Sequence, residues 1–139
     1  MSAERLPHSQ EAEASVLSAM MLGDRASAER GLDLLTADDF HLDLHARIFE
    51  AIGRLVRAGR AVDIVTLTEA MRGSLDPGTE TVLRGYVAQI VDRLPSAANL
   101  EWYAETVRDH AVRRRLVEAA RSMTRAAGDA DTPLGEVVA

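Results

Sequence analysis

Two histidines and three nearby aspartates form the stretch of this sequence with the strongest potential for metal binding. His41 and His45 are four residues apart, which would place both on one face of a helix, and the aspartates lie between positions 38 and 43. The HExxH motif of zinc hydrolases requires a glutamate directly after its first histidine, and this sequence has none there. His45 also lies next to an apolar helical stripe that includes Leu44. We therefore predict no metal site and a partly buried, structural position for His45.

Glu11 and Glu13 are of the type that serves as general acid or base in many enzymes. Residues two apart point to different sides of a helix, so these carboxylates would not share a site. Both stand in the expected first turn of a helix, where negative charge is favourable beside the positive end of the helix dipole. We predict this dipole role for both, and no catalytic residue in the chain.

Arg113, Arg114 and Arg115 form a short basic run with Arg108 and His110 close by. Phosphate binding is one interpretation of this run. The flanking acids and the absence of interleaved aromatic residues, which would stack on bases, favour a solvated face or ion pairs with a partner.

The composition excludes several classes of enzyme and partner. All 16 basic residues are arginines, so the chain lacks the lysine that a P-loop or a Schiff-base enzyme requires. A formal net charge of −6 argues against a domain that binds nucleic acid by itself, and we expect little or no direct binding. The absence of cysteine fits a reducing compartment, and no apolar run approaches the ~20 residues of a membrane span. We expect a cytoplasmic protein with no membrane contact and no cofactor of its own.

The elements that position these residues are predicted to be helices, because apolar residues recur at helical spacing between turn signals and no strand-like alternation is present. We predict an all-α fold, a compact multi-helix domain followed by a long helix. Helix starts are expected after the N-caps Ser9, Asp63 and Asp76, and helix ends at Gly23, Gly59 and Pro95.

The long helix, expected from Ser96 to about Ala127, changes its buried face in the middle. Its first half has the apolar stripe Leu100, Ala104, Val107 and Ala111. Continuing that spacing leads to Arg114 or Arg115, which cannot be core positions unless they are paired. The second half has a new stripe, rotated by about 100°, at Val112, Leu116, Ala119, Met123 and Ala126. No remaining helix of this chain is expected to cover the new stripe fully, which indicates a protein–protein interface.

Four segments are predicted along the chain. Residues 1–8 are expected to be a flexible N-terminus, residues 9–95 a globular helical core, and residues 96–128 the long helix. Residues 129–139 would be a linker and the start of another helix, with Thr132 as its cap and Pro133 as its first residue. Because this helix would be incomplete, we interpret the end of the chain as a fragment boundary or a truncated hairpin.

Three stretches resemble the N-terminal domain of bacterial replicative DNA helicases of the DnaB type. The stretch LPHSQEAEASVLSAMMLG is similar to the opening of that family, AVDIVTLTEAM to its second signature, and LPSAANLEWYAETVRDHAVRRRL to the pattern along its long helix. The similarity runs from about Arg5 to Gly128 in the family's order and spacing. His45 also matches the family, which favours its structural role, whereas His41 stands where the family commonly has tyrosine.

The resemblance implies a helicase that encircles single-stranded DNA as a hexamer and uses ATP and magnesium, which bind to a separate ATPase domain. The family's N-terminal domains form a collar, commonly a trimer of dimers, that recruits the DnaG-type primase. The second half of the long helix would then be one arm of a hairpin that pairs with a neighbouring subunit. The dimer interface would comprise Val112, Leu116, Ala119 and Met123.

The family's binding surface for the primase C-terminal domain, carried over position by position, would involve Glu11, Tyr86, Val117 and Met123. Three neighbouring apolar residues already supply the buried stripe of the helix around Tyr86, so we expect its ring to be free at the edge. Met123 would serve dimerisation instead if the two surfaces compete. Two alternatives stay open: a stand-alone adaptor that binds primase or helicase without an ATPase domain, and a DNA-binding domain, which conflicts with the negative net charge.

Overall fold

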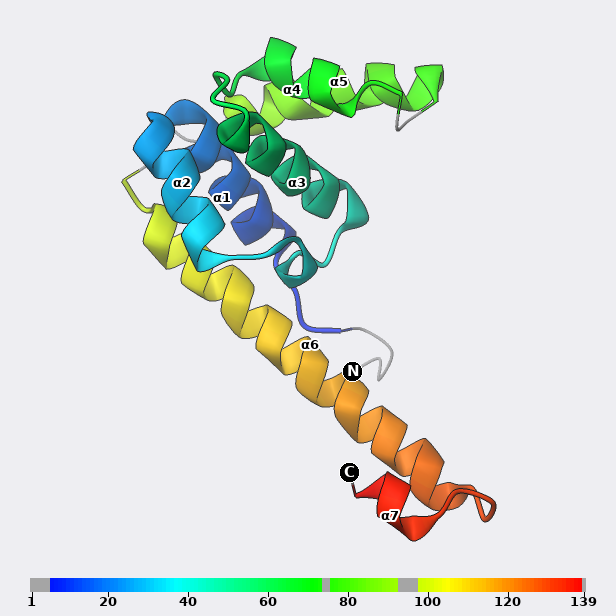
Figure 1. Cartoon of the computed structure of the whole chain (residues 1–139). Helices are drawn as coiled ribbons and strands as arrows, with labels where there is room; N and C mark the ends of the chain where they lie inside the picture. Colours follow the sequence, from blue (N-terminus) through cyan, green and yellow to red (C-terminus); the bar gives the residue numbers. More distant parts are fainter. Residues whose placement is uncertain (1–5, 74–75, 93–97, 139) are drawn as a thin grey trace.

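The computed structural model describes residues 6–73, 76–92 and 98–138, and in these ranges all regular structure is helical (Figure 1). The α-helices are α1 (Gln10–Leu22), α2 (Arg25–Leu34), α3 (Asp43–Arg57), α4 (Ile64–Met71), α5 (Pro77–Val91), α6 (Leu100–Gly128) and α7 (Leu134–Val137). A 3-10 helix, η1 (Ala37–Asp39), lies between α2 and α3. The predicted all-α class is confirmed, and none of the described helices is long and apolar enough to cross a membrane.

Side-chain caps fix the starts of four helices. The Ser9 hydroxyl accepts a 3.1 Å hydrogen bond from the backbone N–H of Ala12 at the start of α1. Asp24, Asp63 and Asp76 accept equivalent bonds of 3.1, 2.8 and 2.8 Å at the starts of α2, α4 and α5. Each bond satisfies a backbone donor that has no partner inside its helix. The predicted N-caps Ser9, Asp63 and Asp76 are therefore confirmed.

The first helix, α1, forms the centre of the domain. Every residue from Ala12 to Met21 is buried, as expected of a helix that is packed on all sides. Helices α2, α3, α5 and α6 surround it (Figure 1). The largest fully buried side chains of this core include Leu17, Met20, Ile48, Ile52, Leu67, Met71, Leu83 and Ile90.

The long helix α6 packs on this core along its first half. The predicted stripe of Leu100, Ala104, Val107 and Ala111 is buried, and this half contacts α1 and α2. The second half projects away from the globular part, and α7 lies beside its final turns (Figure 1). This arrangement explains why the buried stripe does not continue to the end of α6, since only the first half has the core beside it.

α6 begins at Leu100, and both the predicted start at Ser96 and the predicted stop at Pro95 lie outside the described residues. Pro133, predicted as the first residue of the last helix, is instead its N-cap. Thr132 does not cap that helix, because its hydroxyl donates a 2.9 Å hydrogen bond back to the carboxylate of Asp129.

Candidate protein-interaction surfaces

The second half of α6 carries an exposed row of apolar side chains, which we call the α6 row: Val112, Leu116, Ala119 and Met123. Val112, Leu116 and Met123 expose 44%, 65% and 53% of their surface, and Ala119 is also exposed. The neighbouring helix α7 leaves these side chains in solvent. A continuous apolar row on a projecting helix is a surface that another protein can cover.

Arg114 continues the buried stripe of α6 by one further turn. It is only 8% exposed, and it donates hydrogen bonds of 2.9 Å to the carbonyl oxygen of Pro7 and 2.7 Å to that of Asp39. Burial lowers the pKa of this guanidinium, and the Glu13 carboxylate partly opposes that effect. We expected a break in the buried stripe here, but two carbonyl partners satisfy the condition under which a charged residue can be buried.

The neighbouring arginines are also bonded within the chain. Arg115 donates a 2.7 Å hydrogen bond to the carboxylate of Asp39, whose other oxygen accepts a 2.8 Å bond from the Thr36 N–H. Arg113 pairs with Asp109 at 3.1 Å on the exposed side of α6. Arg114 and Arg115 thus tie α6 to η1 and to the segment before α1. These internal bonds account for the basic run without a phosphate ligand.

Glu13, predicted to complement the dipole of α1, is instead a buried acceptor with 1% exposure. Its carboxylate accepts hydrogen bonds from His45 Nδ1 at 2.8 Å and from the backbone N–H groups of His41 and Leu42 at 2.8 and 3.3 Å. Burial by itself raises the pKa of this carboxyl, but the hydrogen bonds outweigh burial and the net shift is downward. Glu13 does lie in the first turn of α1 as predicted, but its burial was missed because residue type does not reveal which side of a helix a distant loop covers. Glu11 is exposed in the same turn.

His45 connects Glu13 to Tyr86. The histidine is fully buried, its Nε2 is hydrogen-bonded to the Tyr86 hydroxyl, and the two rings stack with their centroids 5.7 Å apart. Both ring nitrogens are therefore engaged by protein groups, which supports a structural role and a deeper burial than we predicted. Tyr86 is half-buried at the edge of the core, and its hydroxyl is hydrogen-bonded inward, so its ring is held in place rather than free.

His41 and His45 do not share a helical face, because α3 begins only at Asp43, which leaves His41 in the preceding loop. Its ring stacks on that of His8 with the centroids 4.3 Å apart. Burial, followed by the nearby His8 and the charge of Arg114, lowers the pKa of His41 against the opposing influence of Glu13. In the part of the chain that the structure describes, no group of histidines and acids is arranged to hold a metal.

The residues predicted to bind primase do not all lie in one region of the molecule. Arg114 lies on α6 one helical turn before the half-buried Val117, and it is bonded to the segment that precedes α1. The exposed Glu11, in the first turn of α1, therefore lies toward the same end of the core as Val117. Tyr86 belongs to α5, whereas Met123 lies in the last turns of α6, and these two elements are at opposite ends of the molecule (Figure 1). The structure does not bring Tyr86 and Met123 together within one chain.

Sequence reasoning missed Asp39 and Pro7 as partners of the arginine run. The available signal was a basic residue at the position where an apolar stripe should continue. Such a residue is buried only with a partner. The signal therefore predicts that a partner exists, although it does not identify which one.

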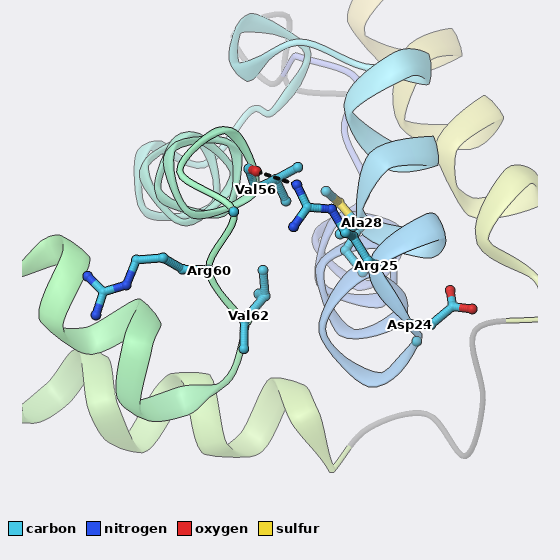
Figure 2. Close-up of a pocket in the computed structure, with 10 residues that line it drawn as sticks. Asp24, Arg25, Ala28, Val56, Arg60 and Val62 are labelled. Carbon is cyan, nitrogen blue, oxygen red and sulfur yellow. Dashed lines mark hydrogen bonds between the residues drawn. The ribbon is translucent and has the colours of Figure 1, made fainter.

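A small cleft of about 340 Å³ opens where α1 and α3 end and α2 begins (Figure 2). Met20, Ala28, Val56 and Val62 contribute apolar surface to it. Arg25 spans the cleft and donates a 2.7 Å hydrogen bond to the carbonyl oxygen of Val56 (Figure 2). None of the predicted binding residues lines this cleft, so it is separate from the surfaces described above.

Comparison with known proteins identifies the family of this helical domain. Residues 5–109 match the family model of the DnaB-like helicase N-terminal domain. The chain belongs to this family.

Individual DnaB relatives agree with that assignment. The crystal structure of the N-terminal domain of DnaB helicase from Mycobacterium tuberculosis is similar with a TM-score of 0.85 and 30% identity, over 96% of this chain and 93% of that chain. The replicative DNA helicase DnaB of Treponema pallidum is 39% identical over 132 residues, which are 95% of this chain and 30% of the relative. The replicative DNA helicase DnaB of Geobacillus stearothermophilus is 37% identical over 86% of this chain and 26% of the relative. The chain thus spans less than a third of the length of these two DnaB helicases.

Proposed function

We propose that the chain is the collar domain of a hexameric replicative DNA helicase, where it mediates subunit dimerisation and ring assembly and recruits a DnaG-type primase during DNA replication. In this proposal ATP and magnesium bind to an ATPase domain outside the present chain. The family assignment supports the general role. The observation that carries the proposed assembly role is the α6 row, which is exposed on a projecting helix.

Dimerisation through the α6 row has a direct test in the double variant Leu116→Asp/Met123→Asp. Covering the row in a dimer would bury two uncompensated charges per subunit, at a cost of several kcal/mol, roughly 3–5. Sedimentation velocity over a range of concentrations should show dimers of the parent chain and monomers of the variant. The matched control is Val65→Asp/Val82→Asp, which changes two valines of α4 and α5 that are 70% and 69% exposed and lie off the row. Loss of dimers in the control, or unchanged dimers in the first variant, would contradict the assignment.

Primase recruitment is the second part of the proposal, and Glu11, Tyr86, Val117 and Met123 are its proposed contacts. Tyrosine is a frequent anchor at interfaces, and truncating one that serves as a hot spot costs about 2 kcal/mol or more, a thirtyfold loss of affinity. Calorimetric titration of the cognate primase C-terminal domain should therefore show weaker binding to Tyr86→Ala and Val117→Asp. Binding of both folded variants with the affinity of the parent would rule out this surface.

A further inference from the structure

We propose that His45, oriented by Glu13, positions the ring of Tyr86 for contact with a partner, and that Tyr86 contributes to this contact through its ring rather than its hydroxyl. The proposal rests on the proposed function in taking Tyr86 as part of the primase-binding surface. Its structural basis is a buried chain of hydrogen bonds that runs from α1 through α3 to α5.

The direction of the first hydrogen bond is set at Glu13. An ionised carboxylate can only accept, so His45 Nδ1 carries the proton that lies 2.8 Å from Glu13. The backbone N–H groups of His41 and Leu42 hold the same carboxylate in place. In the neutral imidazole, Nε2 is then the acceptor, and the Tyr86 hydroxyl donates to it. Glu13 therefore determines which His45 nitrogen faces Tyr86.

Tyr86 uses its hydroxyl to face the interior. The helix that carries it, α5, packs on α1 and α4, and the hydrogen bond to His45 links it to α3 as well. Because the hydroxyl is hydrogen-bonded inward to the buried His45, the ring is the part of the half-buried Tyr86 that a partner can contact, through an apolar or cationic side chain. A ring that is already fixed loses less side-chain freedom on binding than a mobile one.

His45 itself cannot touch a partner, because it is fully buried. Any effect of His45 on binding must therefore pass through Tyr86 or through the stability of the fold. These two routes can be separated by a variant that keeps the bond to Glu13 and removes the bond to Tyr86. His45→Asn is such a variant, since its amide N–H can replace Nδ1 and it has no group at the position of Nε2.

The experiment is a calorimetric titration of the cognate primase C-terminal domain against folded single variants and a double variant. Tyr86→Ala should lose about thirtyfold in affinity, whereas Tyr86→Phe and His45→Asn, which keep the ring but release it, should each lose about three- to fivefold. His45→Asn should cause no further loss in the Tyr86→Ala background, because its effect passes through the ring that is absent there. Tyr103→Phe is the matched control, since Tyr103 is the second of the two tyrosines and lies on α6, and its affinity should equal that of the parent.

The free chain provides an independent test by NMR. Tyr86 and Tyr103 give the only two tyrosine ring signals, and His45→Asn should shift the Tyr86 signals while leaving those of Tyr103 in place.

Equal losses of affinity from His45→Asn with and without Tyr86 would overturn the positioning role and leave the primase surface intact. Losses from Tyr86→Phe as large as those from Tyr86→Ala would show that the hydroxyl, not the ring, contributes to the contact. Unchanged affinity of Tyr86→Phe would also overturn positioning, even if His45→Asn did not fold. Unchanged affinity of Tyr86→Ala would overturn the proposed surface itself.

Discussion

The guanidinium of Arg114 donates a 2.7 Å hydrogen bond to the carbonyl oxygen of Asp39, a residue 75 positions earlier in the chain. Arg115 bonds the carboxylate of the same aspartate at 2.7 Å, and Arg114 also holds Pro7, 107 positions earlier. These bonds join α6 to η1 and to the segment before α1 at the point where the long helix leaves the core. They extend the anchored part of α6 by one turn beyond its apolar stripe.

We predict that Arg114→Met destabilises the chain by about 2–4 kcal/mol, because the buried carbonyl oxygen of Asp39 and the partly buried one of Pro7 lose a charged donor that a thioether cannot replace. The change in free energy of unfolding can be measured by urea denaturation followed by circular dichroism. Arg113→Ala is the control, since its pair with Asp109 is exposed and should contribute less than about 1 kcal/mol. Equal effects of the two substitutions would mean that the Arg114 bonds do not stabilise the fold.

The stability of the domain should fall as the pH is lowered. Folding lowers the pKa of His41 below its ordinary value of 6.5. The contribution of the neutral ring to the free energy of unfolding is therefore complete above pH 6.5, and it is lost as the pH falls through the pKa of the folded state. Folding also lowers the pKa of Glu13 below 4.5, so the contribution of its carboxylate is lost at more acidic pH. Urea midpoints at pH 8, 5.5 and 4 should decrease in that order. The Glu13→Gln variant should be less stable than the parent at pH 7, and its urea midpoint should decline less steeply below pH 5. A decline as steep as that of the parent would exclude Glu13 as a source of the pH dependence.

Two helical glycines should respond to alanine in opposite directions. A methyl group at Gly31 would lie 2.5 Å from the sulfur of the buried Met20, and we expect Gly31→Ala to destabilise by about 1–3 kcal/mol through overpacking. A methyl group at Gly85 meets nothing within 4 Å, and Gly85→Ala should stabilise α5 by about 0.5–1 kcal/mol through helix propensity. Thermal unfolding of the two variants beside the parent chain tests both signs.

The purified chain is expected to hydrolyse no ATP, with or without single-stranded DNA. It contains no lysine, and a P-loop requires one against the nucleotide phosphates. A coupled assay for ADP release tests this expectation, with boiled protein as the background. Turnover that is stimulated by DNA and that co-purifies with the chain through two columns would contradict it.

Local sequence patterns were enough to predict the helices, most of their described boundaries and the buried stripe on the first half of α6. Ser9, Asp63 and Asp76 act on backbone donors three residues away, so their capping role depends on local chain geometry alone. The buried stripe of Leu100, Ala104 and its successors follows from the helical repeat in the same way. Local rules suffice where the partner of a residue lies within one turn.

The roles of Glu13, Tyr86 and Arg114 depend on how the helices assemble. The partner of Glu13 lies 32 positions away in the chain, that of Tyr86 lies 41 away, and the two partners of Arg114 lie 75 and 107 away. No spacing rule specifies which distant loop or helix will face such a residue. Glu13 became a buried acceptor because the loop before α3 brings two N–H groups and His45 onto it. A charged residue is buried only where the packed chain supplies such partners, and that supply depends on how the helices assemble.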